Sequence, residues 1–179
     1  MQRENFYVIT GGPGAGKTSL LDSLASKGFS CIAETARQII KERLSKGLPP
    51  RPDPQTFAQG IFDNDYLNFT RNSKLNSTLF FDRSMLDSAW QLFKANRATY
   101  GAIKNFIIQN RYNKRVFFAP PWKEIYTPDS ERDHTYEESI EIYGELKQWY
   151  VQHQYEIIAI PKTTIEERVT FILKYLPAN

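Results

Sequence analysis

The sequence has few of the features that mark secreted, disulfide-stabilised or membrane-spanning proteins. Its 179 residues include one cysteine, Cys31, so no internal disulfide can form, and a reducing compartment is expected. No apolar run approaches the ~20 residues that cross a bilayer. The first residues, Met1 to Asn5, lead directly into a short apolar run and glycines, which is not the pattern of a signal peptide. We therefore expect a cytoplasmic protein without a membrane span.

The charge is too evenly balanced to indicate a nucleic-acid partner. The chain has 23 basic and 20 acidic residues and a formal net charge of +3, whereas nucleic-acid binding usually requires a concentrated basic face. The two histidines, His134 and His153, have no metal-ligand spacing. The length suits one domain with one sizeable core, and residues 1–179 are expected to form it.

Short apolar runs alternate with amphipathic helical patterns, which predicts an α/β fold with a parallel sheet and helices on both faces. Helix-start signals are expected at Thr35, at Asp53 followed by proline, at Thr135 and at Thr163. Strands are expected at 6–9, 29–33, 78–81, 115–118 and 155–160, and helices after the glycine loop and at 35–46, 54–71, 84–96, 100–110, 135–152 and 163–176.

The segment Gly11-Gly12-Pro13-Gly14-Ala15-Gly16-Lys17-Thr18 matches the phosphate-binding pattern G-x-x-x-x-G-K-[ST]. Its glycines let backbone N–H groups turn inward toward phosphate oxygens, and the helix that follows adds its positive end. Lys17 supplies a cation for the outer phosphates, and the Thr18 hydroxyl suits Mg²⁺. The pattern predicts a P-loop NTPase that binds ATP and Mg²⁺ through Gly12, Pro13, Gly14, Ala15, Gly16, Lys17, Thr18 and Ser19.

Asp82 and Arg83 follow the third predicted strand, at the sheet edge where parallel α/β proteins bind ligands. A carboxylate there suits Mg²⁺ or its water shell. The alternative is that Asp82 caps the next helix, but Ser84 is available for that role, so the metal role is favoured. Arg83 is expected either to hold an anionic or hydroxyl-bearing acceptor or to form a structural ion pair.

Glu34 ends the second predicted strand at the same edge, and Arg37 follows one helical turn later. A carboxylate in this position is suited to accept a proton from an acceptor hydroxyl. Together with Arg83, these residues form a predicted acceptor site. The alternative for Glu34 and Arg37 is ordinary surface charge on the first turn of a helix.

The segment Ala119–His134 has no clear periodicity and follows a predicted strand, so we expect a lid over the bound triphosphate. Arg132 is the candidate to stabilise the transferring phosphoryl group, and Lys123 and Arg115 are weaker candidates. Trp122 is expected to pack the loop rather than stack on a base. Asn113 begins Asn-Lys-Arg-Val, which lacks the aspartate of guanine-specific GTPases and so favours adenine or loose base choice.

The chain resembles a family of small predicted ATPases that group with P-loop kinases, close to ribosylnicotinamide-kinase-like domains. The resemblance rests on the phosphate loop and on Glu34-Thr35-Ala36-Arg37, Phe81-Asp82-Arg83-Ser84, Pro120-Pro121-Trp122, Asp129-Ser130-Glu131-Arg132 and Pro161 to Arg168. It implies a five-stranded parallel sheet of order 2-3-1-4-5 and a lid after the fourth strand. Asp82-Arg83-Ser84 is similar to the Glu-Arg-Ser box of deoxynucleoside kinases, with aspartate in place of glutamate.

Two functions fit these patterns. The first is ATP-dependent phosphoryl transfer to a nucleoside-like or other small hydroxyl compound, with Lys17, Glu34, Asp82 and Arg132 as catalytic residues and Thr18 and Asp82 at the metal. The second is a nucleotide-hydrolysing switch that binds a protein or lipid partner. The kinase hypothesis requires an acceptor pocket lined by Glu34, Arg37 and Arg83.

Overall fold

A five-stranded, wholly parallel sheet forms the centre of the molecule, with strand order β2-β3-β1-β4-β5. The computed structural model describes residues 2–126 and 135–177. The order agrees with the one implied by the family resemblance. The phosphate loop joins the central strand β1 (Phe6–Gly11) to α1 (Lys17–Ser26), so it lies at the carboxyl edge of the sheet. Ligands bind at this edge in open parallel sheets.

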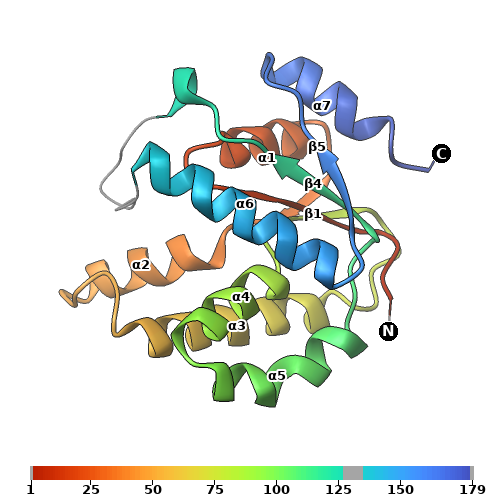
Figure 1. Ribbon diagram of the computed structural model, residues 1–179. Coiled ribbons are helices and arrows are strands. Elements are labelled where there is room, and N and C mark those ends of the chain that lie inside the picture. The colour runs from red at the N-terminus through yellow and green to blue at the C-terminus, as the bar shows by residue number, and fades with distance from the viewer. Residues whose placement is uncertain (1, 127–134, 178–179) are drawn as a thin grey trace.

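The remaining elements alternate as the hydrophobic pattern predicts (Figure 1). They are β2 (Ser30–Ile32), α2 (Thr35–Ser45), α3 (Pro54–Arg71), β3 (Leu79–Asp82), α4 (Met85–Ala95), α5 (Arg97–Gln109), β4 (Arg115–Ala119), a short 3₁₀ helix η1 (Lys123–Ile125), α6 (Tyr136–Gln152), β5 (Glu156–Ala159) and α7 (Ile165–Leu173).

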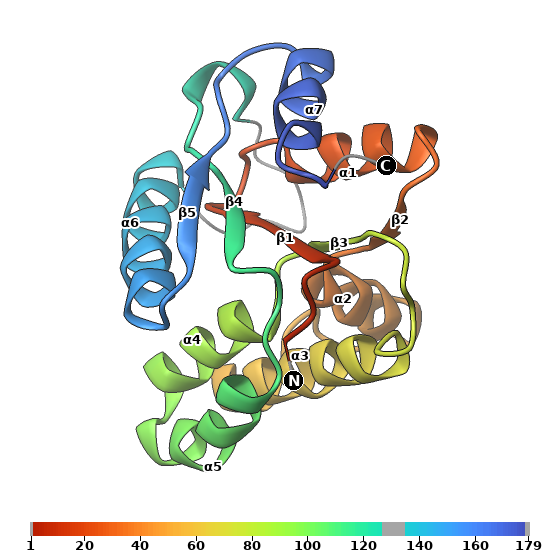
Figure 2. The same ribbon diagram turned by 90° about the vertical axis from the view of Figure 1, so that its right-hand side faces the viewer.

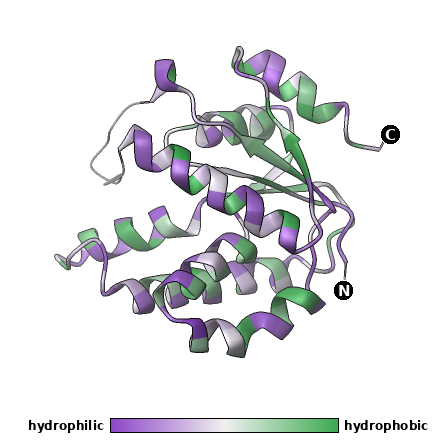
Figure 3. Ribbon diagram, viewed as in Figure 1, coloured by the Kyte–Doolittle hydropathy of each residue, from purple (hydrophilic) through white to green (hydrophobic). Residues whose placement is uncertain are grey.

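Each face of the sheet has its own buried core, because successive strand residues point to opposite faces. In β1, Phe6 and Val8 pack with residues of α3 to α6, whereas Tyr7 and Ile9 pack with residues of α1 and α7. Figure 2 shows α1 and α7 together on one side of the sheet and the other helices away from them. In Figure 3 the strands are mainly hydrophobic and the helices are mixed, as expected for a sheet covered on both faces.

Two of the predicted helix starts are confirmed. The Asp53 side chain accepts a hydrogen bond from the backbone N–H of Thr56 at 3.0 Å, with Pro54 in the first position of α3. Thr135 and Glu138 form the expected reciprocal capping box at the start of α6. In both cases the donors and acceptors lie within four residues of each other, so the local pattern alone specifies the contact.

The other two helix starts were wrong in detail. Thr35 does not cap α2: its hydroxyl donates instead to the buried carboxylate of Asp65 in α3, at 2.6 Å. The Thr35 hydroxyl therefore bonds a residue of another helix instead of capping its own helix. The start of α7 shifts by one residue, since Thr164 rather than Thr163 accepts from the backbone N–H of Glu167.

Asn113 does not bear on the choice of base. It lies two residues before β4, at the edge of the sheet opposite the phosphate loop, and its side chain forms hydrogen bonds with the backbones of Glu4 and Arg115. In the part of the chain that the structure describes, no helix is both long and apolar enough to span a bilayer.

Candidate nucleotide and acceptor site

The phosphate loop adopts backbone angles that favour glycine at several of its positions, among them Gly14 and Gly16. Gly14 and Gly16 have φ angles of 76° and 73°, in the left-handed region that side chains disfavour. A side chain at Gly14 would also collide with the ring of Tyr126, and one at Gly16 would press on Ile125 and Arg168. Any other residue at these two positions would therefore strain the backbone, and the segment around η1 together with α7 covers the outer side of the loop.

Lys17 is buried at the start of α1, and its ammonium group donates to the carbonyl of Gly12 at 2.9 Å. Burial and the nearby charge of Arg83 lower the pKa of Lys17 to about 8, although Asp82, Glu34 and Asp87 act in the opposite direction. The charges of these three carboxylates favour the protonated form of the ammonium group. This places a cation within the loop, where an outer phosphate is expected.

Asp82 ends β3 and is 5% exposed. Its Oδ1 is buried and has no hydrogen-bond partner among residues 2–126 and 135–177. Burial, with the neighbouring charge of Glu34, raises the pKa of Asp82 to about 7. The capping alternative fails because Ser84 caps α4, in a reciprocal box with Asp87. A buried carboxylate oxygen without a partner suits a cation, so Asp82 fits a Mg²⁺ site.

Thr18 and Ser19 lie exposed on the first turn of α1. Thr18 also lines the pocket described below, so its position fits the expected Mg²⁺ contact. In the described ranges no three His, Cys, Asp or Glu side chains gather in a metal-binding group. Mg²⁺ at phosphate sites usually binds one or two protein ligands and completes its shell with phosphate oxygens and water.

Arg83 directs its guanidinium toward two carboxylates. Its Nε donates to Glu34 Oε1 at 2.9 Å, and its Nη1 lies 3.4 Å from Asp87 Oδ1. Glu34 and Asp87 raise the pKa of Arg83 against the effect of burial. Arg83 also has a φ of 69°, which is uncommon for a residue with a side chain. Such strain is tolerated where the surroundings impose it, and functional sites are frequent examples.

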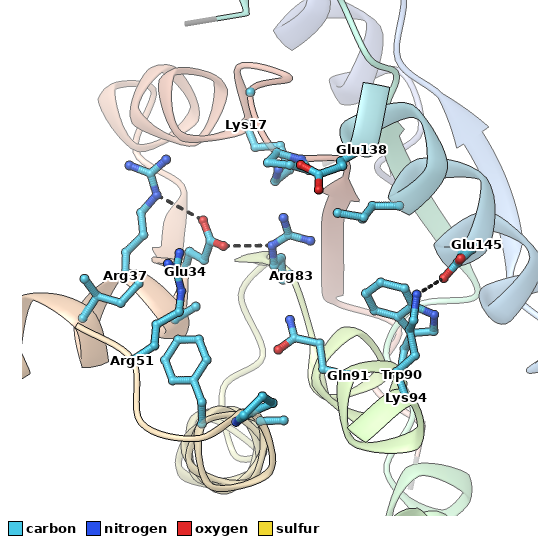
Figure 4. Close-up of a pocket in the computed structure, with 18 of the residues that line it drawn as sticks. Lys17, Glu34, Arg37, Arg51, Arg83, Trp90, Gln91, Lys94, Glu138 and Glu145 are labelled. Atoms are coloured by element: carbon cyan, nitrogen blue, oxygen red, sulfur yellow. Dashed lines mark hydrogen bonds and ion pairs between the residues drawn. The ribbon is translucent and has the colours of Figure 1, made fainter. Parts of the chain in front are cut away.

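Glu34 bridges two arginines, since it also accepts from Arg37 Nε at 3.2 Å (Figure 4). Burial alone would raise the pKa of Glu34, but Arg83, Lys17 and Arg37 hold it at about 2. Glu34 is therefore ionised at neutral pH and is a weak proton acceptor. It can still accept a hydrogen bond from an acceptor hydroxyl and orient it. The structure thus brings together all three residues predicted for acceptor binding.

Asp87 was not predicted as a site residue, although its hydrogen bonds connect the elements beneath Arg83. Its carboxylate accepts from the backbone N–H of Ser84 at 2.9 Å and from the Tyr150 hydroxyl at 2.5 Å, and also from the Thr10 hydroxyl. These contacts link β1, α4 and α6 beneath Arg83. The Ser-x-x-Asp spacing could have indicated the local capping contact but not the other two.

A pocket of about 640 Å³ extends from the phosphate loop past Glu34 and Arg83 into a space between α3, α4 and α6. Figure 4 shows Trp90, Gln91 and Lys94 of α4 at its far end, with Glu145 of α6 beyond them. Lys94 Nζ lies 2.7 Å from Glu145 Oε2 and 4.9 Å from the Trp90 ring centre. No motif in the sequence marks this end, because its residues come from separate, individually ordinary positions on three helices.

Arg132 and residues 127–134 of the predicted lid lie outside the described residues, so Arg132 stays a prediction. The described part, Ala119 to Tyr126, includes η1 and packs on the phosphate loop through Tyr126 and Ile125. Arg115 begins β4 at the opposite edge of the sheet and lies 3.7 Å from Glu156, which removes it as a candidate.

Solved kinase structures share this fold at low sequence identity. A deoxyadenosine kinase from M. mycoides, solved with dCMP and dCDP, superposes with a TM-score of 0.71 and 14% identity, over 94% of this chain and 97% of that one. NadR in complex with NR gives 0.73 and 14%, over 95% of this chain and 51% of that one. Thymidylate kinase from Candida albicans gives 0.61 and 17%, over 96% and 90%.

No curated protein matches the chain significantly. A family model described as "AAA domain" matches residues 6–168, which include the phosphate loop, Glu34, Asp82, Arg83 and Arg168. Because this match covers most of the chain and the fold is that of P-loop kinases, the chain belongs to this family of AAA domains and is kinase-like in structure.

Proposed function

We propose that this protein transfers the terminal phosphoryl group of ATP to a hydroxyl of a small, nucleoside-like acceptor. One observation carries the proposal: a single pocket joins the phosphate loop to the Glu34–Arg83 pair and continues into an aromatic-lined end. A nucleotide-hydrolysing switch needs the first of these parts but not the third. The continuous pocket therefore favours transfer over hydrolysis.

The loop and Lys17 would bind the triphosphate, since the cradle of N–H groups and the buried ammonium both meet phosphate oxygens. Asp82 and Thr18 would hold Mg²⁺, which neutralises charge on the phosphates during transfer. Arg83 lines the same pocket as the loop, so its charge would also be available to the transferring group. These residues supply positioning and charge, which is most of what phosphoryl transfer requires.

In the reaction, the acceptor oxygen forms a bond to the terminal phosphorus while the bond to the bridging oxygen breaks and ADP leaves. Because the transition state is loose, the proton of the hydroxyl is lost late, once the new O–P bond has made it strongly acidic, and it passes to Glu34 and then to water. Glu34 would accept a hydrogen bond from that hydroxyl and hold it in line. Its low pKa is no obstacle to this role, since orientation does not require it to take the proton early.

The far end of the pocket suits a planar ring. Phe57 of α3 and Trp90 of α4 line it, and aromatic side chains pack well against flat ring systems. The Gln91 amide beside them offers both donors and an acceptor to a ring edge. A hydroxyl near Glu34 and a ring near Trp90 are the two parts of a nucleoside-like molecule.

The test is transfer of label from ATP carrying ³²P at its terminal phosphate, with Mg²⁺, to a panel of nucleosides, sugars and vitamins and to a small-molecule cell extract. The proposal expects an acid-stable phosphate ester formed in a one-to-one ratio with ADP, lost in Trp90→Ala and in Lys17→Ala. Release of free phosphate alone, unaffected by every acceptor and by Trp90→Ala, would instead support the hydrolysing switch.

A further inference from the structure

Arg168 is a buried arginine on α7 that points at the outer side of the phosphate loop. It is 2% exposed, although it is charged and lies on a helix that otherwise buries apolar residues against α1. Its backbone N–H bonds the carbonyl of Thr164, so the side chain projects from the first turn of α7. Lysine and arginine are almost never this buried unless they have a specific partner.

The partner of Arg168 is a peptide carbonyl of the loop itself. Nη2 donates to the Ala15 carbonyl at 3.0 Å, and Nη1 would lie 3.0 Å from a side-chain carbon at Gly16. The guanidinium also lies 6.0 Å from the ring centre of Trp122, in the segment after β4. Arg168 thus joins three parts of the chain at the back of the loop.

No carboxylate neutralises this guanidinium within the described ranges. Arg168 forms no ion pair there, and its Nε is buried without a hydrogen-bond partner. Burial without a counter-charge is costly and lowers the pKa of Arg168. An arginine that served only to stabilise the fold would be expected to have an acidic partner or to be replaced by an apolar residue.

The bond to Ala15 affects the other end of the same peptide unit. In a trans peptide the carbonyl of Ala15 and the N–H of Gly16 point in opposite directions. A guanidinium on the carbonyl side fixes the orientation of that unit and polarises it, since linked hydrogen bonds strengthen one another. The N–H of Gly16 would then face the phosphate side of the loop as a stronger donor.

We propose that Arg168 is a positioning residue for nucleotide binding, which acts through the Ala15–Gly16 peptide on a phosphate group. Its positive charge is balanced by the triphosphate across the loop rather than by a carboxylate of residues 2–126 or 135–177. This inference rests on the nucleotide binding of the proposed function, but not on any particular acceptor. It adds a residue 153 positions away in the sequence to the phosphate site.

The experiment compares Arg168→Met and Arg168→Lys with Arg111→Met by calorimetric titration of ATP with Mg²⁺ and by thermal unfolding. Arg111 is a matched control: its Nη2 donates to the His153 carbonyl at 2.8 Å and its guanidinium lies 4.4 Å from the Tyr155 ring centre, at the opposite edge of the sheet. It shares the chemistry of Arg168 without contacting the loop.

We expect Arg168→Met to weaken ATP binding roughly ten- to hundredfold, the scale of one charge-assisted hydrogen bond, with Arg168→Lys in between. The unfolding temperature without nucleotide should fall no further than in Arg111→Met, whereas the increase on adding ATP should shrink only in the Arg168 variants. Wild-type ATP affinity in Arg168→Met would overturn the proposal. So would a loss of affinity in Arg111→Met as large as that in Arg168→Met.

The amide resonance of Gly16 provides a second readout that does not depend on Arg168→Met being well folded. In the wild type it should shift strongly when ADP and Mg²⁺ bind, and in Arg168→Lys the shift should be smaller. An identical shift in both proteins would refute the mechanism. If Lys17→Ala also binds ATP as tightly as the wild type, the failure lies in the proposed nucleotide site rather than in the role of Arg168.

Discussion

Replacement of Glu34 by glutamine should cost both stability and transfer activity. Glu34 is the carboxylate between Arg83 and Arg37, and its side chain is 16% exposed. The variant keeps the shape of the side chain but leaves the buried guanidinium of Arg83 without its closest counter-charge. Loss of one partner from a buried pair is strongly destabilising, because the remaining charge stays out of water.

The magnitude follows from the pKa of Glu34, which is held at about 2 rather than its ordinary 4.5. At about 1.4 kcal/mol for each pKa unit, ionised Glu34 contributes on the order of 3 kcal/mol to the free energy of unfolding. Because the folded-state pKa is the lower one, this contribution is complete above pH 4.5 and is lost as the pH falls through about 2. Glu34→Gln should therefore be less stable than the wild type throughout the range from pH 5 to 8.

Urea unfolding at several pH values measures this effect, with Glu42→Gln as the matched control. Glu42 lies on α2, the helix that Glu34 directly precedes, and forms an ion pair with Lys46 at 2.5 Å, but both side chains are at least 60% exposed. Exposed pairs contribute little, so this variant should unfold and turn over as the wild type does. The reasoning fails if the two variants are equally stable, or if Glu34→Gln still transfers phosphate at the wild-type rate.

Three further variants test the other parts of the site. Lys17→Ala should remain folded but lose nucleotide binding or turnover, as titration with ATP and Mg²⁺ would show; unchanged affinity and turnover would contradict the loop assignment. Asp82→Asn should still bind nucleotide but lose Mg²⁺-dependent turnover roughly a hundredfold or more; turnover that persists with the same Mg²⁺ dependence would make Asp82 purely structural. Asp65→Asn should stabilise the protein at pH 8 and not at pH 4, by up to about 4 kcal/mol. Its pKa is raised to about 7, chiefly by burial, so the wild type loses stability as the pH rises from 4 to 7; equal thermal stability of the two proteins at pH 8 would refute this.

The sequence alone determined the features whose partners lie close together along the chain. The phosphate loop, the start of α3 at Asp53 and the capping box of Thr135 were all predicted from spacings of a few residues, and each was found. The parallel sheet followed from alternating apolar runs, and the strand order from the family resemblance. These features can be predicted because backbone geometry and hydrogen bonds between residues close in sequence determine them.

Only the tertiary structure decided how distant side chains pair. Glu34 and Arg83 are 49 positions apart. The sequence left open whether Glu34 was more than surface charge, and whether Arg83 held an acceptor or formed a structural ion pair. Thr35 had a local role available, but the buried carboxylate of Asp65 provided a better partner for its hydroxyl. Arg168 occupies one helical position among apolar neighbours, and nothing near it in the sequence marks the Ala15 carbonyl as its target. Burial and long-range geometry set these contacts, because each side chain takes the partner that the folded chain brings within reach.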